Sequence, residues 1–469
     1  MNRRGVLTAL IALTLGASLL VGCTGGPPPA TGKPSIVLIL TDDQRFDTLW
    51  GMPWVRSDLM DHGVTFTNGF VSDSLCCPSR ASILTGEYAG ATGVWANRGQ
   101  FGGFEAFRDR PTIATWLQGA GYHTALFGKY LNRYEDTSYV PPGWDRWAAI
   151  DGGASPYNFY YKYNLNLDGR MVRYGNKARD YSTDVLAGLA TQYIHQTKGP
   201  LFMYFAPYAP HTPTDPAPED RNKLADLGPN RPPNYDEADV SDKPAWVRNL
   251  PPLSAKQKAY LDAEKIKEFK TLLSVDRAVE SIVDALQSTG RLQNTMIVFM
   301  SDNGFAWGEH RWANKIVPYE ESIRVPFVVR YDPLVKAART DAHLAVNIDL
   351  APTFAAVAGV GAPGAQGMNM LPLLASPGAA WRHDFLVESM NLLGVPSYCA
   401  VRSDRYMYIS YEATREEELY DLRRDPYELR NSVGDPALAS VLAGMRTRLK
   451  QLCNPPPPVT SGASDEGGG

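Results

Sequence analysis

The stretch SIVLILTDDQ, residues 35–44, decides the class of fold because it joins an uninterrupted apolar run to two aspartates. Residues 36–40 are all apolar, with none of the polar alternation that marks a solvent-facing side. Such runs are typical of strands buried on both faces of a parallel sheet. Ligands of open parallel sheets bind beyond the carboxyl ends of the strands. We therefore predict that Asp42 and Asp43 lie at a functional edge of a parallel sheet.

The same pattern, a buried strand followed by a polar loop, recurs along the chain. Residues 201–205 (LFMYF) run into a proline-rich loop that contains His211. Residues 296–300 (MIVFM) end close to Asp302 and Asn303. The recurrence predicts several buried strands whose following loops carry polar side chains to one edge of the sheet.

Helices are predicted between these strands. Apolar residues recur at three- and four-residue steps through residues 255–289, with Ser254 as an N-cap and Gly290 as a stop. Residues 112–130 read as a helix, a glycine-containing turn and a strand. Helices that alternate with buried strands indicate an α/β domain. We predict a large, mixed, mostly parallel sheet sandwiched by helices over residues 34–370.

The C-terminal part has a different pattern. Residues 398–412 and 417–426 read as short antiparallel strands joined by turns, which predicts a smaller α+β domain with a short antiparallel sheet over residues 371–453. The proline- and glycine-rich residues 454–469 are predicted to form a disordered tail.

The N-terminus has the three-part plan of an export signal. Two arginines precede an apolar run that is short for a membrane span and ends in LVGC at Cys23. We expect residues 1–22 to be a signal peptide and Cys23 to be lipidated, with residues 23–33 as a tether to the outer face of the cell membrane. An ordinary signal peptide with an incidental cysteine is the alternative, and the residues do not distinguish Sec from twin-arginine export.

The overall charge limits the possible partners. The chain has 469 residues and a formal net charge of -4, with no run of basic residues. This composition gives no basic face for nucleic acid, so we expect no nucleic-acid partner. If the substrate is an anion, the positive charge that binds it must be local.

Four side chains at the predicted strand ends suit a metal ion. Asp42, Asp43 and Asp302 would repel one another, and Asn303 adds an amide oxygen. A set of oxygen ligands without histidine or cysteine favours a hard cation, Ca²⁺ or Mg²⁺. Taken alone, each pair could equally form a helix cap or a turn.

The stretch SDSLCCPSRASILTG, residues 72–86, places two cysteines side by side. Adjacent cysteines bridge each other poorly. Pro78 suits the first turn of a helix and Gly86 its end, so Cys76 is predicted to lie just ahead of a helix N-terminus, which favours anions. The later cysteines, Cys399 and Cys453, could bridge outside the cytoplasm, but the sequence does not show that they are close.

At this point the chain resembles the sulfatase family, whose signature is C-x-P-S-R followed by a short helix like ASILTG. The segments TDDQ, GKY and SDNG and the run GEHRWANKIVPYEESIRVP extend the resemblance over nearly the whole mature chain. The segments GKYLNRY, PPGWDRW and YNLNLDG resemble the N-acetylglucosamine-6-sulfatase and arylsulfatase branch. The resemblance implies an alkaline-phosphatase-like fold and conversion of Cys76 to formylglycine, with Cys77 at a tolerant position.

The resemblance also implies roles for individual residues. One Ca²⁺ per chain would be bound by Asp42, Asp43, Asp302, Asn303 and the group derived from Cys76. Arg80 would steady that group, Lys129 and Lys315 would hold the sulfate oxygens, and His211 would contact the leaving oxygen. Asn132 stands where many sulfatases have a histidine, which leaves open the proton acceptor of the elimination step, and His310 is a candidate contact at the rim. For the lysines and histidines alone, solvated or packed side chains would be the ordinary interpretation.

The activity that the resemblance implies is hydrolysis of a sulfuric ester, on a sulfated sugar such as N-acetylglucosamine-6-sulfate or on an aryl sulfate. A formylglycine-generating enzyme would then be a partner during maturation. Two alternatives remain open at this stage. One is a formylglycine-dependent phosphonate monoester or phosphodiester hydrolase, and the other is a lipid-tethered anion-binding protein without catalysis.

Overall fold

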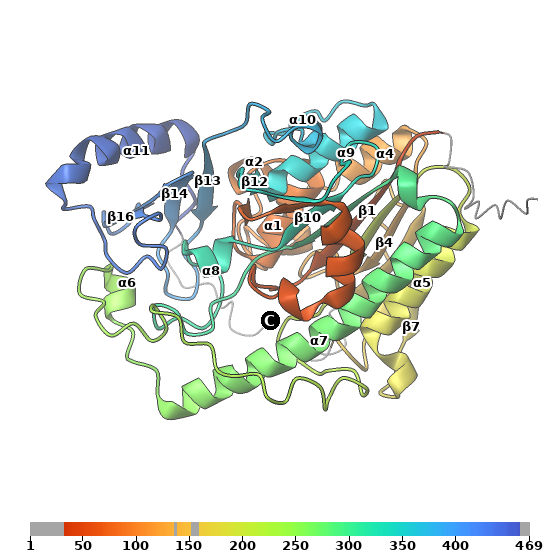
Figure 1. Cartoon of the computed structure of the whole chain (residues 1–469), viewed down its shortest axis with the longest axis horizontal. Coiled ribbons are helices and arrows are strands. Elements are labelled where there is room, and N and C mark those ends of the chain that lie inside the picture. Colours follow the sequence, from red (N-terminus) through yellow and green to blue (C-terminus); the bar gives the residue numbers. More distant parts are fainter. Residues whose placement is uncertain (1–31, 136–137, 152–158, 460–469) are drawn as a thin grey trace, which may run out of the picture.

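The computed structural model describes residues 32–135, 138–151 and 159–459, and its centre is a ten-stranded sheet (Figure 1). The strand order is β11-β2-β10-β9-β1-β8-β4-β5-β6-β7. The strands β9, β1, β8, β4 and β5 run parallel, whereas β10, β6 and β7 are antiparallel to their neighbours. The sheet is therefore mixed and mostly parallel at its centre, as predicted.

The strands and helices of the main part have the following bounds. The strands of the large sheet are β1 (Ser35–Thr41), β2 (Val64–Phe66), β4 (His123–Gly128), β5 (Arg146–Asp151), β6 (Asn164–Leu167), β7 (Arg170–Arg173), β8 (Leu201–Ala206), β9 (Thr295–Ser301), β10 (Phe327–Arg330) and β11 (Arg339–Asp341). A separate pair is formed by β3 (Gly69–Phe70) and β12 (Ala345–Val346). The helices are α1 (Cys76–Thr85), α2 (Ala89–Thr92), α3 (Gly103–Ala106), α4 (Ile113–Gly119), α5 (Ser182–Gln196), α6 (Ala245–Arg248), α7 (Ala255–Ser288), α8 (Glu320–Ile323), α9 (Leu350–Ala358) and α10 (Leu371–Ala375).

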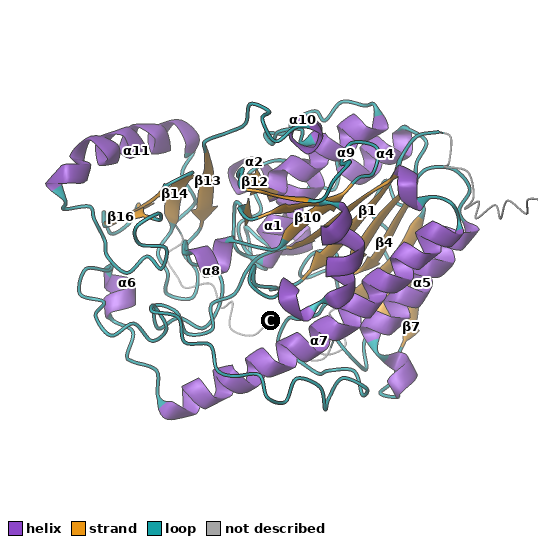
Figure 2. Cartoon of the chain, viewed as in Figure 1, coloured by secondary structure: helices purple, strands orange, loops and turns teal. Residues whose placement is uncertain are grey.

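Helices cover both faces of the large sheet, and the alternation of side chains along β1 shows how (Figure 2). Ile36, Leu38 and Leu40 pack in one core with residues of α1, α4 and α9. Val37 and Ile39 pack in a second core with residues of α5 and α7. Because successive side chains of a strand point to opposite faces, a strand with helices on both sides has to be apolar throughout. The uninterrupted run in the sequence is explained by this sandwich.

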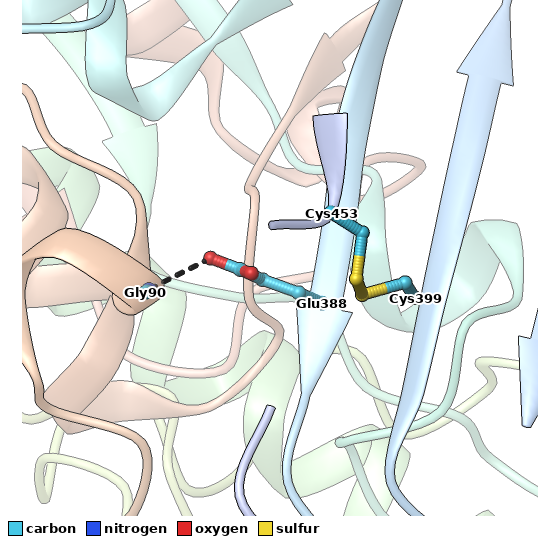
Figure 3. Close-up of a disulfide and its surroundings, with 4 residues drawn as sticks. All are labelled: Gly90, Glu388, Cys399 and Cys453. Carbon is cyan, nitrogen blue, oxygen red and sulfur yellow. Dashed lines mark hydrogen bonds between the residues drawn. A yellow bond between two sulfur atoms is a disulfide. The ribbon is translucent and has the colours of Figure 1, made fainter. Parts of the chain in front are cut away.

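The C-terminal part forms a second, smaller sheet. Its antiparallel strands are β13 (Asp384–Ser389), β14 (Tyr398–Ser403), β15 (Tyr406–Tyr411) and β16 (Glu417–Asp421), and α11 (Ala439–Leu452) packs on one face. A disulfide joins Cys399 of β14 to Cys453 at the end of α11 (Figure 3). The predicted fold class, a sandwiched α/β sheet followed by a small antiparallel sheet, is thus confirmed.

Several predicted elements agree closely with the structure, and others were not predicted. Helix α7 begins after the Ser254 cap, whose side chain accepts a hydrogen bond from the Gln257 backbone N–H, and Gly290 follows its end with a positive φ. The antiparallel strand β10 and the strand β13 were not predicted. No described helix combines the length and apolar character that crossing a membrane requires. The predicted signal peptide and Cys23 lie outside the described residues.

Candidate active site

The parallel register of β1 and β9 brings the predicted acidic residues together. Thr41 pairs with Ser301, so Asp42 and Asp43 follow one strand at the level where Asp302 and Asn303 follow the other. The Asp43 backbone N–H donates to Asp302 Oδ1 at 3.1 Å, and Asn303 Nδ2 donates to Asp43 Oδ1 at 2.7 Å. Asp43 has a φ of 66°, which turns the chain sharply at the strand end. These four side chains are buried and form one cluster.

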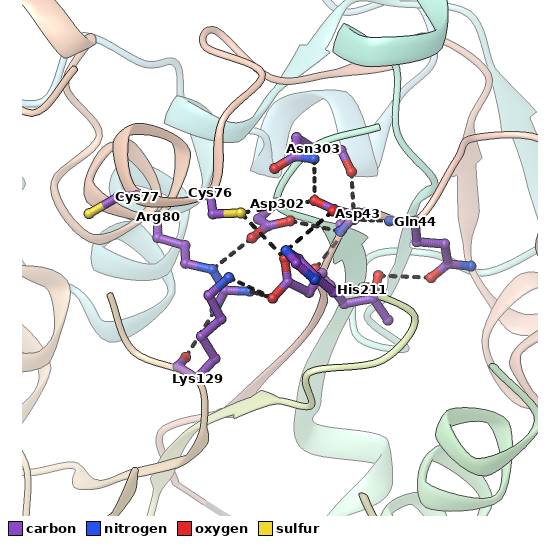
Figure 4. A network of polar contacts seen from close by, with 12 residues as sticks. Asp43, Gln44, Cys76, Cys77, Arg80, Lys129, His211, Asp302 and Asn303 are labelled. Atoms are coloured by element: carbon purple, nitrogen blue, oxygen red, sulfur yellow. Dashed lines mark hydrogen bonds and ion pairs between the residues drawn. The ribbon is translucent and has the colours of Figure 1, made fainter. Parts of the chain in front are cut away.

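Cys76 joins this cluster as the first residue of α1 (Figure 4). The prediction placed it just ahead of the helix, so the helix begins one residue earlier than expected. Cys76 Sγ lies 3.5 Å from Asp42 Oδ1 and 3.9 Å from Asp43 Oδ1. The Cys77 sulfur points away from the cluster and is buried in the core beneath the sheet. The two adjacent cysteines therefore have different environments, and only Cys76 faces the acidic cluster.

Two lysines from distant parts of the chain reach the same cluster. Lys315 Nζ lies 2.8 Å from Cys76 Sγ and 2.6 Å from Asp43 Oδ1. Lys129 Nζ lies 2.6 Å from Asp42 Oδ2. Lys129 follows Gly128, whose φ is 118° and where a Cβ would meet the Ala206 carbonyl oxygen at 1.9 Å. Only glycine fits there, and this turn carries Lys129 toward the site.

Arg80 supports the cluster from inside α1. Its side chain is fully buried, its Nε donates to Asp302 Oδ2 at 2.7 Å, and its Nη1 donates to the Lys129 carbonyl oxygen at 2.9 Å. Its Nη2 lies 3.7 Å from Asp42 Oδ2. The guanidinium therefore ties two strand-end carboxylates and the Lys129 loop to the helix that carries Cys76.

His211 approaches from the loop after β8. Its Nε2 lies 3.5 Å from Asp43 Oδ2, and its Nδ1 contacts the Thr212 carbonyl oxygen. Burial lowers the pKa of the His211 imidazole, against the opposite effect of Asp43. The Thr212 carbonyl accepts from Nδ1–H, so the neutral ring presents Nε2 to the cluster.

The charges in the cluster influence one another strongly. Burial opposes ionisation of Asp42, but Lys129, His211 and Arg80 outweigh it, and the pKa of Asp42 lies below its ordinary value. Burial and the Asp42 charge raise the pKa of Asp302 to about 6. Clusters of buried groups with shifted pKa values are found preferentially at functional sites.

The donor set fits a hard divalent cation. Ligand atoms of Asp42, Asp43, Cys76 and His211 all lie within 4.8 Å of one another. Asn303 Oδ1 is buried and has no hydrogen-bond partner among the residues that the structure describes. A buried amide oxygen without a partner costs free energy unless a ligand satisfies it. Carboxylate and amide oxygens are the ligands that Ca²⁺ and Mg²⁺ prefer, so the residues present fit such an ion.

A cavity of about 400 Å³ opens onto the cluster. Asp43, His211 and Lys315 line its inner end, and the N-terminal half of α7 forms one wall. The remaining lining residues include Asn97, Phe305, Trp307 and Asn314. A concave site with mixed apolar and polar lining next to charged groups is the usual form of a small-molecule site.

Three of the predicted substrate contacts, Lys129, Asn132 and His310, lie outside the lining of this cavity. His310 is 1% exposed, lies outside the cavity lining, and its Nδ1 pairs with Glu237 Oε2 at 2.7 Å. The predicted rim contact is therefore corrected: His310 is a buried residue of a polar cluster. Asn132 also lies outside the lining; its backbone carbonyl accepts from the Phe104 N–H.

Several residues that line the cavity were not predicted from the sequence, because the fold brings them together from separate segments of the chain. Asn97 lines the cavity, and its Oδ1 accepts the Cys77 backbone N–H at 3.0 Å, one of the free groups at the start of α1. No motif surrounds Asn97 in the sequence. Tyr260, Glu264 and Glu268 lie on a helix that was predicted, but nothing in its periodicity shows that they face a cavity.

The fold and the site together place a buried cluster of carboxylates, lysines and a cysteine at the carboxyl ends of parallel strands, next to a cavity. Residues 34–360 match the sulfatase family, and residues 308–454 match the C-terminal part of N-sulphoglucosamine sulphohydrolase. The chain belongs to the sulfatase family, whose members are sulfuric ester hydrolases.

Two relatives illustrate the family relationship. Human N-acetylglucosamine-6-sulfatase is 35% identical over 402 residues, which cover 81% of this chain and 71% of the human protein. An extracellular sulfatase SULF-1 homolog from Drosophila melanogaster is 36% identical over 373 residues, 76% of this chain. That match covers 33% of the fly protein, so the chain spans about a third of its length.

Solved structures share the fold. A protein in complex with its substrate, D-glucosamine-2-N,6-O-disulfate, superposes with a TM-score of 0.79 at 24% identity, over 90% of this chain and 97% of the other. A phosphonate monoester hydrolase of Agrobacterium radiobacter gives a TM-score of 0.71 at 22% identity, over 90% and 95%. These likenesses concern the fold, and they agree with the predicted alkaline-phosphatase-like architecture.

Proposed function

We propose that this protein removes sulfate from a sulfated amino sugar of the N-acetylglucosamine-6-sulfate type, with a formylglycine made from Cys76 as nucleophile and a bound divalent cation. The convergence of Cys76 Sγ with Asp42, Asp43 and Lys315 at the N-terminus of α1 is the observation that carries the proposal. The names of the relatives support the sugar class, because the human relative is an N-acetylglucosamine-6-sulfatase.

The sulfur of Cys76 stands where the oxygens of hydrated formylglycine would lie. One hydroxyl of the hydrate would attack the sulfur atom of the sulfate ester. The second hydroxyl would let the aldehyde re-form, and this step would release inorganic sulfate. A formylglycine-generating enzyme is accordingly a proposed partner during maturation. The cation, proposed to be Ca²⁺, would be held by Asp42, Asp43, Asp302 and Asn303, and it would lower the pKa of a bound hydroxyl.

The lysines would bind the sulfate group. Lys315 lines the cavity with its Nζ 2.6 Å from Asp43 Oδ1, and Lys129 Nζ lies 2.6 Å from Asp42 Oδ2 in the same cluster, so both ammonium groups lie near the position proposed for the sulfate oxygens. The reaction places negative charge on the departing oxygen, and preorganised cations stabilise that charge in the transition state. His211, in its protonated form, would donate from Nε2 to the leaving oxygen. Arg80 is a positioning residue, because it holds Asp302 and the Lys129 loop.

Release of inorganic sulfate tests the proposal. Protein produced together with a formylglycine-generating enzyme is supplied with N-acetylglucosamine-6-sulfate, 4-nitrophenyl sulfate or bis-4-nitrophenyl phosphate. Faster turnover of the sulfates, lost in Cys76→Ala, supports the proposal. Faster turnover of the phosphate diester would favour the phosphonate and phosphodiester alternative, and binding of the sugar without any hydrolysis would favour the binding protein.

The location of the protein is a separate proposal. We infer that the chain is exported and lipid-anchored through Cys23, because LVGC follows an apolar run. The Cys399–Cys453 disulfide supports export, since such bonds persist mainly in oxidising compartments. Metabolic labelling with a radioactive fatty acid, lost in Cys23→Ala, is the expected result, and label retained in that variant would contradict it.

A further inference from the structure

A second buried cluster of metal-binding side chains lies outside the cavity. His310, from the segment between β9 and α8, comes together with Glu321 of α8 and with Glu428, which follows β16. One ring nitrogen of His310 and one carboxylate oxygen of each glutamate lie within 4.8 Å of one another. The three residues are at most 7% exposed, and none of them lines the cavity. The cluster is therefore separate from the candidate active site, and it joins the C-terminal part of the chain to the main part.

Three oxygen atoms in this cluster have no hydrogen-bond partner among the residues that the structure describes. They are Glu321 Oε2, Glu428 Oε1 and Oδ1 of the neighbouring Asn234, and all three are buried. The second oxygen of each carboxyl group is held in place: Glu321 Oε1 accepts from Asn234 Nδ2 at 2.9 Å, and Glu428 Oε2 accepts from the Glu320 backbone N–H at 3.0 Å. Buried oxygens without partners cost free energy unless a ligand satisfies them.

The same two glutamates have no ion pair among the described residues. Three neighbouring carboxylates do have one: Glu237 with Lys243, Glu320 with Arg402, and Glu309 with Arg45. Lys243 Nζ donates to the backbone carbonyl oxygen of Glu428 and to the Tyr420 hydroxyl rather than to the Glu428 carboxyl group.

Without a counter-charge, these two carboxyl groups hold protons more readily. Burial and the charges of Glu320 and Glu321 raise the pKa of Glu428 well above its ordinary value. Burial and the charge of Glu309 raise the pKa of Glu321 to about 7. A divalent cation between the two glutamates would balance both negative charges and take the place of these protons.

The imidazole of His310 is oriented as a metal ligand would be. Its Nδ1 lies 2.7 Å from Glu237 Oε2, and Lys243 on the other side of Glu237 favours the carboxylate form. Nδ1–H therefore donates to Glu237 and the lone pair is left on Nε2, the arrangement found in most metal-binding histidines. The Tyr319 ring stacks on the imidazole with 4.1 Å between centroids. Asn234 Nδ2 lies 3.2 Å from Nε2, and a half-turn of this amide would present the unpartnered Oδ1 instead.

We propose that this cluster binds a second divalent cation, Zn²⁺, which links the C-terminal sheet to the main part of the chain. The ligands would be His310 Nε2 and one carboxylate oxygen each of Glu321 and Glu428, and Asn234 Oδ1 would complete a four-coordinate site. Zn²⁺ accepts histidine nitrogen together with carboxylate oxygen in structural sites of four ligands. Ca²⁺ and Mg²⁺ prefer oxygen ligands alone. The inference is independent of the proposed sulfatase function, because none of these residues belongs to the Cys76 cluster.

Metal analysis of the intact chain tests the inference. Protein is produced in medium that contains both Zn²⁺ and Ca²⁺ and is purified without a chelator, and its metals are measured by mass spectrometry. We expect one zinc ion per chain and a higher Tm than that of protein produced without zinc. Asp43→Asn should lose Ca²⁺ and keep the zinc. X-ray absorption at the zinc edge of the wild type should show nitrogen and oxygen ligands at about 2.0–2.2 Å and no sulfur, which would exclude zinc bound to Cys76.

Variants that keep the side-chain shape assign the zinc to this cluster. Glu321→Gln and Glu428→Gln each remove one ligand charge, so the Kd for Zn²⁺ should rise at least about tenfold and the zinc-dependent rise in Tm should be lost. Glu412→Gln, at an exposed position of the same C-terminal part, is the matched control and should bind zinc as the wild type does.

Two results would overturn the inference. Glutamine mimics a protonated glutamate, so carboxyl groups that hold only protons would give a wild type without zinc and variants at least as stable as the wild type. Zinc content that is unchanged in both glutamine variants would show that the ion lies elsewhere. The absorption spectrum needs only the wild type, so a zinc shell that contains sulfur would also contradict the site even where a variant fails to fold.

Discussion

Lys315 Nζ lies 2.8 Å from Cys76 Sγ, although the two residues are 239 positions apart in the sequence. The same ammonium lies 2.6 Å from Asp43 Oδ1. One cation thus faces both the nucleophile position and a proposed metal ligand, where charge would develop on a bound sulfate.

Lys315→Ala should therefore lower kcat/KM for N-acetylglucosamine-6-sulfate by roughly 10²–10³-fold, the usual effect of removing one group that stabilises transition-state charge. Steady-state kinetics measures the effect, and Lys315→Arg should recover part of the loss. The matched control is Lys336→Ala, an exposed lysine outside the site. A Lys315→Ala enzyme with wild-type kcat/KM would contradict the assigned role.

Arg80→Ala should destabilise the fold as well as the site. Removal of the guanidinium leaves the buried Asp302 without its ion-pair partner, while Asp42 keeps Lys129; loss of one partner of a buried pair typically costs about 3–5 kcal/mol in free energy of unfolding. Thermal or denaturant unfolding measures this loss. Arg415→Ala is the control, because the Arg415 side chain is 79% exposed. Equal stability of Arg80→Ala and the wild type would show that the ion pairs are not structural.

Removal of the cation should abolish hydrolysis and lower Tm. Three carboxyl groups lie in the cluster, and an ion bound only by the folded state stabilises that state by an amount that grows with the logarithm of the ion concentration relative to Kd. Activity and Tm after dialysis against EDTA should recover on addition of Ca²⁺, and a parallel addition of Mg²⁺ tests the identity of the ion. Asn303→Ala should raise the Ca²⁺ concentration required. Full activity with no metal detected by mass spectrometry would refute the metal proposal.

The buried carboxyl group of Glu388, on β13, makes the free energy of unfolding depend on pH. Burial raises its pKa to about 7, while the Gly90 backbone N–H that it accepts at 3.0 Å acts in the opposite direction (Figure 3). With a folded pKa above the unfolded value near 4.5, the folded state holds the proton longer, so this stability is present below pH 4.5 and is lost as pH rises through about 7.

Glu388→Gln should therefore flatten the decline of Tm between pH 5 and pH 8, as measured by calorimetry at several pH values. Glu412→Gln is an exposed control on the same C-terminal part and should keep the wild-type slope. Parallel curves for the wild type and Glu388→Gln would contradict the role of Glu388.

The Cys399–Cys453 disulfide should stabilise the C-terminal sheet against α11. It closes a segment of 54 residues, and bonds of this kind typically contribute about 2–4 kcal/mol. Cys399→Ala together with Cys453→Ala should lower Tm, while sulfate release at 25 °C is retained because both cysteines lie outside the site cavity. An unchanged Tm in the double variant would show that the bond contributes little.

The sequence predicted the elements whose pattern is local. The apolar run of β1, the cap and periodicity of α7, and the helix after Cys76 all follow from short-range rules. The antiparallel strand β10 has four residues, Phe327–Arg330, too few for a clear pattern. The role of α7 as a cavity wall depends on loops that approach it from elsewhere in the chain.

His310 shows why motif context alone misplaces a side chain. It lies in GEHRW near other motif residues, so a rim contact was the natural expectation. Its ring is instead held by Glu237 and Asn234, which are 73 and 76 positions away in the sequence. Such long-range partners leave no local signal, and the same is true of the pairing between Lys315 and Cys76.

The proposed sulfatase activity depends on conversion of Cys76 to the formylglycine nucleophile. Mass spectrometry of the peptide that contains Cys76, from protein made in its own host, tests it most directly when sulfate release is measured on the same preparation. We expect an aldehyde or its hydrate at Cys76, an unmodified Cys77, and a rate of sulfate release proportional to the modified fraction. An active preparation in which Cys76 is an unmodified cysteine would contradict it.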